Sequence, residues 1–198
     1  IAVAPLAGAL GAEITGVDLA SDISAETITE IRRAWLAHLV VFFRDQELDP
    51  DAFLAFARHI GEPVEYPFVS GIDGYPEIIE VTKLPHETVN FGGIWHSDTV
   101  YLERPPMASM LIAREVPPRG GDTQFANMYA AYEALALDVK RKIDGLRAVN
   151  TSALADVSKT REDRMRDHGG DADGKEYIAV HPVVRTHPET GRNALYVN

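Results

Sequence analysis

Cysteine is absent from this chain of 198 residues. Without thiols the chain can form no disulfide, no thiolate metal site, no iron–sulfur cluster and no cysteine nucleophile. Any metal ion must therefore be held by histidine, aspartate or glutamate side chains.

Positive charge and long apolar runs are also scarce. The 19 Lys and Arg residues face 30 Asp and Glu residues, a formal net charge of −11, so no sequence-wide positive field exists to hold a phosphate backbone. No apolar run approaches the roughly 20 residues needed to cross a bilayer, and the N-terminus lacks a basic stretch followed by an apolar one. We therefore predict a cytoplasmic protein with neither a nucleic-acid nor a membrane partner.

The remaining composition is that of a globular protein. Apolar residues make up 45% of the chain, which is enough to bury a core. We expect residues 1–198 to form a single domain that assembles as a homo-oligomer. The chain opens at Ile1 rather than Met and stops at Asn198 directly after a strand-like run. We therefore expect a truncated domain whose C-terminal part is missing.

Two helices are predicted in the first third of the chain. Ser24 is placed to cap a helix whose apolar side chains recur every three or four residues over 28–39. Asp49 and Pro50 are typical of the start of a second helix, and Gly61 is available as its left-handed end.

Short runs rich in β-branched and aromatic residues dominate the rest of the chain. We expect a β core with helices outside it, as in a sandwich, jelly-roll or barrel. Residues 9–19 are expected to form a strand or a hairpin, and further strands are expected at 39–43, 78–82, 94–101, 107–116 and 123–126. The segments 181–186 and 193–197 are expected to form a hairpin.

Two other segments lack this β pattern. Residues 128–144 are expected to form a helix that can restart at Asp138 after a kink and ends at Gly145. Between 156 and 176, charged residues and a Gly-Gly pair predominate, and apolar residues do not recur at the spacing of a helix or a strand. This composition favours a mobile loop, which serves either as a lid over a pocket or as a solvated tether.

His96 and Asp98 form a candidate metal-binding pair. Residues i and i+2 of a strand point to the same face, so the two side chains can grip one ion together. The spacing alone is weak, because seven His and 30 acidic residues give about one such match by chance. The second match, His187 with Glu189, lies among turn residues. A hydrogen-bonded interior histidine is the alternative interpretation of His96.

Several longer segments around this pair carry a more specific signal. In chain order they are 11–19, 41–44, 92–99 (GGIWHSDT), 104–106, 120–123, 130–135, 181–188 (HPVVRTHP) and 194–198 (ALYVN). Together they resemble the taurine dioxygenase-like (TauD/TfdA) family of Fe(II)/2-oxoglutarate-dependent dioxygenases, over nearly the whole chain.

The resemblance implies a mainly β fold with flanking helices, namely the double-stranded β-helix (jelly-roll) of clavaminate synthase-like enzymes. It also implies Fe(II) as the metal, with 2-oxoglutarate and O2 as co-substrates that yield succinate and CO2. The implied substrate is a small anionic molecule, such as an organosulfonate, an alkyl sulfate or an aryloxyalkanoate. Imidazole and carboxylate ligands suit Fe(II) and leave coordination positions open.

By position in the family motif, His96 and Asp98 are implied to be catalytic iron ligands, and Thr123 to bind a 2-oxoglutarate carboxylate. An ordinary strand residue is the alternative interpretation of Thr123. The family's second iron histidine and its 2-oxoglutarate arginine have no match up to Asn198. Gly92 stands near a polar sulfonate-binding position of the taurine enzymes, which disfavours taurine itself. The candidate substrate-pocket residues are Tyr66, Val69, Thr99 and Tyr196, for each of which core packing is an alternative.

Two other functions stay open. One is a non-catalytic jelly-roll binding domain that lacks a complete iron site. The other is a hydrolase that uses the same ligands to hold Zn²⁺ and a metal-bound water. The hydrolase would need neither O2 nor 2-oxoglutarate and would release no succinate.

Overall fold

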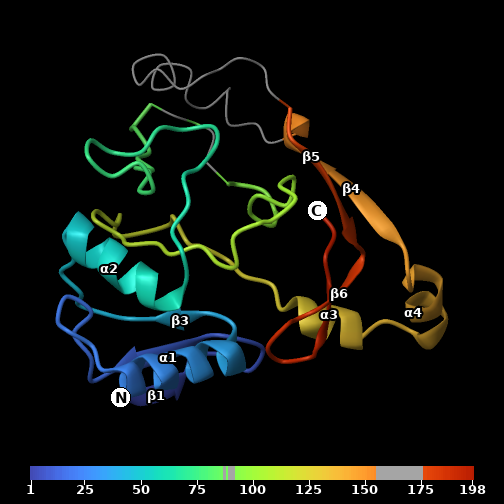
Figure 1. Cartoon of the computed structure of the whole chain (residues 1–198), viewed down its shortest axis with the longest axis horizontal. Coiled ribbons are helices and arrows are strands. Elements are labelled where there is room, and N and C mark those ends of the chain that lie inside the picture. The colour runs from blue at the N-terminus through green and yellow to red at the C-terminus, as the bar shows by residue number, and fades with distance from the viewer. Residues whose placement is uncertain (87, 89–91, 155–175) are drawn as a thin grey trace. The chain divides into compact units, whose positions relative to one another are not determined.

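The computed structural model describes residues 1–86, 88, 92–154 and 176–198. Within them the chain forms seven short strands, four α-helices and one 3-10 helix (Figure 1). The elements are β1 (Ala2–Pro5), β2 (Ala12–Thr15), α1 (Ala25–His38), β3 (Val41–Phe42), α2 (Pro50–Ile60), α3 (Met128–Glu133), α4 (Leu137–Ile143), β4 (Arg147–Thr151), η1 (Ser152–Leu154), β5 (Ile178–Pro182), β6 (Val184–Thr186) and β7 (Asn193–Leu195). The predicted mobile loop 156–176 lies outside the described residues, except for Glu176.

The chain divides into two compact units. The first consists of residues 1–62, 108–144 and 184–195, and the second of residues 63–107, 145–183 and 196–198. Because the stretches of the two units alternate along the chain, neither unit is one contiguous segment. The single domain stays a prediction. Over the described residues, no helix has the length and apolar character needed to span a membrane.

The first unit contains a three-stranded sheet covered by α1. Strand β2 pairs antiparallel with β1 and parallel with β3, and α1 packs against β2 and α2 (Figure 1). The apolar side chains between these elements form the core, because burying them removes their surface from water. The core residues are Ile14, Leu19, Ile23, Ile31, Ala34, Leu48 and Phe56.

Both predicted helix starts are confirmed. The Ser24 hydroxyl accepts a hydrogen bond from the Thr27 backbone N–H at 3.1 Å, and the Asp49 carboxylate accepts one from Ala52 N–H at 2.8 Å. The predicted end at Gly61 is wrong in detail, since Gly61 is extended, with φ −175°. Pro63 disfavours helical backbone at Glu62, the residue before it, so the helix does not continue beyond Gly61.

The predicted strands at 78–82, 94–101, 107–116 and 123–126 are wrong, because none of them pairs with another strand in the described chain. Their composition suits a strand, but a strand also needs a neighbouring backbone that satisfies its N–H and C=O groups. The predicted run 39–43 shortens to the two residues of β3. The predicted kink in 128–144 is confirmed as the break between α3 and α4.

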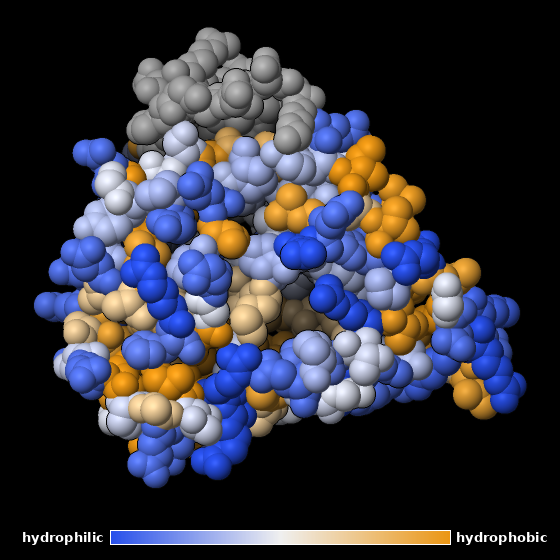
Figure 2. Space-filling view, in the orientation of Figure 1, coloured by the Kyte–Doolittle hydropathy of each residue, from blue (hydrophilic) through white to orange (hydrophobic). Residues whose placement is uncertain are grey.

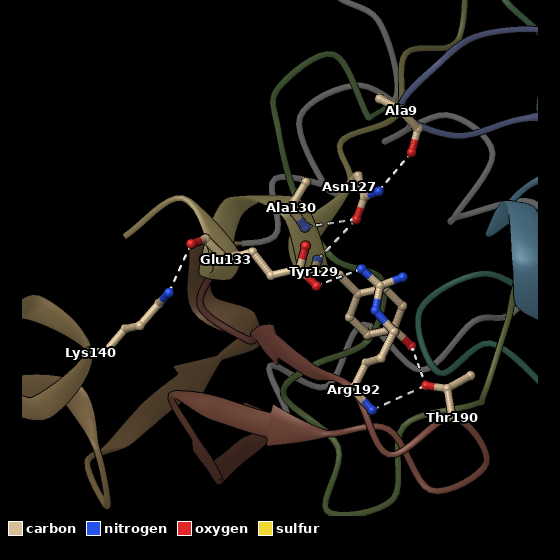
Figure 3. Close-up of polar contacts among 8 residues, drawn as sticks. All are labelled: Ala9, Asn127, Tyr129, Ala130, Glu133, Lys140, Thr190 and Arg192. Carbon is tan, nitrogen blue, oxygen red and sulfur yellow. Dashed lines mark hydrogen bonds and ion pairs between the residues drawn. The ribbon is translucent and has the colours of Figure 1, made fainter. Parts of the chain in front are cut away.

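The predicted hairpin near the end of the chain is confirmed as β6 paired with β7. Its turn is attached to α3 through Arg192 (Figure 3). The Arg192 guanidinium lies 4.2 Å from the ring centre of Tyr129 and 2.6 Å from the Glu133 carboxylate. The Tyr129 hydroxyl lies 3.2 Å from the Thr190 hydroxyl. These contacts join residues about 60 positions apart through charge and aromatic packing.

The second unit contains the antiparallel pair of β4 and β5. Side chains alternate between the two faces of this pair. Asn150, Ala179 and His181 are buried on one face, whereas Val149 and Val180 are exposed on the other. The surface along β4 and β5 is accordingly apolar in the space-filling view (Figure 2). His181 thus belongs to β5 rather than to the hairpin in which it was predicted.

Candidate active site

His96 and Asp98 face each other in the second unit. The His96 Nε2 atom lies 3.1 Å from a carboxylate oxygen of Asp98. The prediction that the two residues lie on a strand is wrong, because Asp98 begins a turn that continues to Tyr101. Both side chains are partly exposed, His96 by 41% and Asp98 by 55%, so the site is open to a ligand from solvent.

The other ring nitrogen of His96 fixes the orientation of the imidazole. Its Nδ1 lies 2.7 Å from the Ile94 carbonyl oxygen. Because a carbonyl oxygen only accepts, Nδ1 carries a proton and donates it. A histidine that binds a metal through Nε2 has this arrangement, with its other N–H held by a carbonyl or carboxylate. His96 Nε2 and the Asp98 carboxylate can therefore either bind a cation between them or form an imidazolium–carboxylate ion pair.

The spacing of the pair fits a metal ion. Imidazole nitrogen and carboxylate oxygen ligands lie about 2.0–2.2 Å from a bound metal, and two such ligands at a right angle are about 3.0 Å apart. The 3.1 Å separation of His96 and Asp98 is close to this value. Over the ranges that the structure describes, no group of three His, Asp or Glu residues is placed to hold an ion. The described chain thus provides two ligands, of types that suit Fe(II).

The absence of a side chain at Gly92 leaves room for the His96 ring. A Cβ atom at position 92 would lie 3.1 Å from His96 Cε1, which is tighter than ordinary van der Waals contact. Gly92 also has φ +68°, a left-handed conformation that favours glycine. A side chain here would both strain the backbone and press on the imidazole.

The backbone is strained immediately after Asp98. Thr99 has φ +51°, which is an outlier for a β-branched residue. The following Val100 and Tyr101 are buried, with 3% and 6% exposure, and the Leu102 N–H closes the turn on the Thr99 carbonyl at 2.9 Å. Strained residues of this kind persist where the surrounding structure holds them.

An aromatic cluster borders the acidic member of the pair. The Phe68 ring makes edge contacts with Tyr66, Tyr101 and Tyr177 at centroid distances of 5.5–5.7 Å. Burial raises the pKa of both Tyr66 and Tyr101, and the Asp98 carboxylate raises both pKa values further. The charge of Asp98 therefore acts on both hydroxyls.

A hydrogen bond joins the Tyr66 and Tyr101 hydroxyls. It raises the pKa of Tyr101 and lowers that of Tyr66. The two hydroxyls are therefore coupled to each other beside Asp98.

The candidate pocket residues lie in several environments. Tyr66 and Thr99 belong to the surroundings of Asp98 just described. Val69 is half-buried one residue after Phe68. Tyr196 is half-buried, and its ring packs edge-on against the His181 ring at 5.5 Å. Their function as a substrate pocket stays a prediction.

Thr123 belongs to the first unit, whereas His96 and Asp98 belong to the second. It is exposed and follows Gly120 and Gly121, which both have φ +74°. The strand predicted at 123–126 is not present there. Binding of 2-oxoglutarate by Thr123 stays a prediction.

Two buried residues near the pair, Tyr101 and His181, were not predicted as site residues. Tyr101 lies three positions after Asp98, in a segment that was expected to be a strand. His181 lies 8% exposed on β5, and the alternation of Ala179 and His181 with exposed neighbours is the sequence signal for its burial.

Comparison with known proteins identifies the family. The model of the family described as "Taurine catabolism dioxygenase TauD, TfdA family" matches residues 2–198. A curated relative, the alpha-ketoglutarate-dependent sulfate ester dioxygenase of Pseudomonas putida, is 36% identical over 196 residues, which are 96% of this chain and 64% of the relative. An alkylsulfatase of Acinetobacter baylyi is 33% identical, over 96% of this chain and 60% of the relative.

The fold agrees with the sequence comparison. The crystal structure of a taurine dioxygenase from Burkholderia xenovorans superposes with a TM-score of 0.75 at 34% identity, over 98% of this chain and 62% of that chain. The chain thus spans less than two thirds of the length of these proteins. Because it shares sequence and fold with them over nearly all of its own length, the chain belongs to the TauD/TfdA family of dioxygenases.

Proposed function

We propose that the protein is an Fe(II)- and 2-oxoglutarate-dependent dioxygenase that hydroxylates a small anionic substrate. The observation that carries the proposal is the His96–Asp98 pair, whose ligand atoms are 3.1 Å apart. The Nδ1 contact of His96 with Ile94 leaves Nε2 to bind the metal. Membership of the TauD/TfdA family supports the same metal and co-substrates.

The proposed site divides the chemistry between the cofactor and the protein. When bound, Fe(II) supplies the redox chemistry that couples decarboxylation of 2-oxoglutarate by O2, giving succinate and CO2, to hydroxylation of the substrate. His96 binds through a neutral nitrogen, and Asp98 contributes the negative charge that favours a divalent cation. From its position in the family motif, we assign Thr123 to 2-oxoglutarate, where its hydroxyl would donate a hydrogen bond to a carboxylate oxygen. Gly92 keeps the space beside the His96 ring open.

The described residues provide two of the three ligands expected for this family. We propose that the second histidine, and the arginine that binds the far carboxylate of 2-oxoglutarate, come from protein outside residues 1–198. They would complete the jelly-roll as well as the site. The share of the relatives' length that the chain covers, 60–64%, is consistent with this division. Homo-oligomeric assembly and a cytoplasmic location stay predictions.

For the substrate, we propose a sulfate ester ahead of a sulfonate or an aryloxyalkanoate. The support is the sulfate ester and alkylsulfatase names of the two relatives. In this chain, the Tyr66 hydroxyl can donate a hydrogen bond to an anionic oxygen, because burial raises its pKa and keeps it protonated. Hydroxylation next to a sulfate ester oxygen leaves a product that separates into an aldehyde and free sulfate.

The test combines spectroscopy and turnover. Anaerobic addition of Fe(II) and 2-oxoglutarate should give a visible metal-to-ligand charge-transfer band, because 2-oxoglutarate chelates the metal only at a site with adjacent open positions. Alkyl sulfates, alkanesulfonates and aryloxyalkanoates are then compared by succinate release in the presence of O2. The expected result is the band together with the fastest release on alkyl sulfates.

Each alternative function predicts a different result. A non-catalytic binding domain would give no charge-transfer band and no succinate. A Zn²⁺ hydrolase would cleave the ester without O2 or 2-oxoglutarate. Either outcome would contradict the proposed function, whereas a band with faster turnover of sulfonates would change the substrate only.

A further inference from the structure

The turn after Asp98 needs an external support. Residues 98–101 form a turn that begins at Asp98 itself, and Thr99 has a left-handed backbone, which is unfavourable for a β-branched residue. No strand ladder of the described chain fixes this segment. Without other contacts the turn would relax, and the Asp98 carboxylate would move relative to His96.

His181 supplies one such contact across 79 positions of sequence. Its Nε2 lies 2.9 Å from the Leu102 carbonyl oxygen. Since that oxygen only accepts, the imidazole donates its Nε2 proton. The Leu102 N–H is itself bonded to the Thr99 carbonyl. His181 thus holds the residue that closes the strained turn.

The His181 ring is in turn held from two sides. Burial on β5 leaves it 8% exposed, and the Tyr196 ring contacts it edge-on, with an interplanar angle of 74°. The Tyr196 N–H donates to the Val183 carbonyl at 2.8 Å, which fixes the segment that carries the ring. A buried donor fixed in this way directs its hydrogen bond to one position.

A second contact holds the segment between the two proposed ligands. The Ser97 N–H donates to the Asn198 side-chain oxygen at 2.8 Å. Ser97 lies between His96 and Asp98 in the sequence, so this bond and the bond from His181 to Leu102 hold the backbone before and after Asp98. Both come from the segments that the family resemblance singled out at 181–188 and 194–198.

We propose that His181 is a positioning residue for the metal site. Through its hydrogen bond to Leu102 it holds the strained turn at Thr99 and thereby keeps the Asp98 carboxylate beside His96. The inference rests on the proposed function for the metal, but the support of the turn is a property of the protein alone. The alternative is an ordinary buried histidine that only stabilises β5.

The test is substitution of His181 with two residues that separate packing from hydrogen bonding. His181→Phe keeps a ring against Tyr196 but removes the donor, whereas His181→Gln keeps an N–H donor. Mn(II) serves as the probe, since it takes the same hard ligands as Fe(II) and its free form is counted by electron paramagnetic resonance. His187→Phe, in the hairpin turn after β6, is the matched control.

We expect His181→Phe to raise the Mn(II) dissociation constant about tenfold, as is typical for the outer support of a metal ligand. His181→Gln should restore most of the affinity, and His187→Phe should leave it unchanged. Thr99→Gly placed in the His181→Phe background should recover part of the loss, because glycine adopts the left-handed backbone without strain. A residue that only stabilises β5 would not respond to a change at position 99.

Backbone amide hydrogen exchange of residues 97–102 gives a reading that needs no metal. In His181→Phe these amides should exchange at least tenfold faster, while the β4 amides keep their wild-type rates. Unchanged exchange in 97–102 would overturn the inference, as would a general loss of protection in β4. Wild-type protein that binds no Mn(II) would instead contradict the proposed metal site, and the exchange rates would still decide the inference about His181.

Discussion

The hydrogen bond between Tyr66 and Tyr101 allows a double-mutant cycle beside the proposed metal site. Tyr101 is 6% exposed and shares this bond with the half-buried Tyr66. Removing one hydroxyl leaves the other without this partner, whereas removing both leaves two rings of nearly the same shape. The cycle therefore uses Tyr66→Phe, Tyr101→Phe and the double variant.

The expected magnitudes follow from burial. Tyr66→Phe leaves the more buried Tyr101 hydroxyl without this partner, which costs about 1–3 kcal/mol of unfolding free energy. Tyr101→Phe leaves the more accessible Tyr66 hydroxyl without its partner and costs about 0.5–1.5 kcal/mol. The double variant should cost less than the sum of the two, with a coupling of about 1 kcal/mol.

Urea denaturation of each variant measures the cycle. Tyr132→Phe combined with Tyr101→Phe is the control, because the Tyr132 ring contacts Lys140 in the first unit, and that pair should be additive within about 0.5 kcal/mol. A coupling below about 0.5 kcal/mol between positions 66 and 101 would refute the hydrogen bond. In the same variants, loss of the Tyr66 hydroxyl should raise KM for an alkyl sulfate more than loss of the Tyr101 hydroxyl, since only the former is proposed to contact the anion.

Three other predictions test separate parts of the molecule. Asp98→Ala should abolish Mn(II) binding, because it removes the anionic ligand of the pair, and stoichiometric metal in this variant would contradict the site. Thr123→Ala should raise the 2-oxoglutarate dissociation constant about two- to tenfold, because it removes one hydrogen bond of about 0.5–1.5 kcal/mol. Thr123→Ser keeps the hydroxyl and should leave the dissociation constant unchanged. Equal affinity of the wild type and both variants would show that Thr123 does not bind 2-oxoglutarate. Hydrogen bonds from Arg32 lower the pKa of Glu189 in the folded protein. The stability that these bonds contribute is therefore fully present above the pKa of Glu189 in the unfolded chain, about 4.3. It is lost as the pH falls through the lower pKa of the folded protein. Arg32→Met should therefore flatten the acid side of a thermal-stability profile, and an unchanged profile would show that the pair adds nothing.

The helices were predictable because their signals are local. Ser24 and Asp49 cap helices by bonds to residues three positions ahead, and such bonds require only a short stretch of sequence. The restart after α3 was likewise visible in the sequence, although Ala136, rather than an acidic side chain, precedes α4. The first turn of α4 nevertheless contains Asp138, where a carboxylate favours the helix start.

The strands were less predictable because pairing depends on distant backbone. The segment 107–116 has the composition of a strand but no partner in the described chain, whereas β4 pairs over five residues with β5. Composition sets which residues tolerate extended backbone, and pairing decides which of them form a ladder. The hairpin of β6 and β7 succeeded as a prediction because its partner follows within a short turn.

The candidate site shows the same division between local and distant causes. The spacing of His96 and Asp98 correctly predicted that the two side chains meet, but it assumed a strand in which the pleat would fix their common direction. In the turn that the structure shows, direction depends on contacts that no local pattern contains. His181 reaches the turn from 79 positions away, and its buried place on β5 depends on pairing with β4. The geometry of the pair is thus set by the tertiary fold, and a change remote from His96 and Asp98 in sequence can alter metal affinity while both ligands remain.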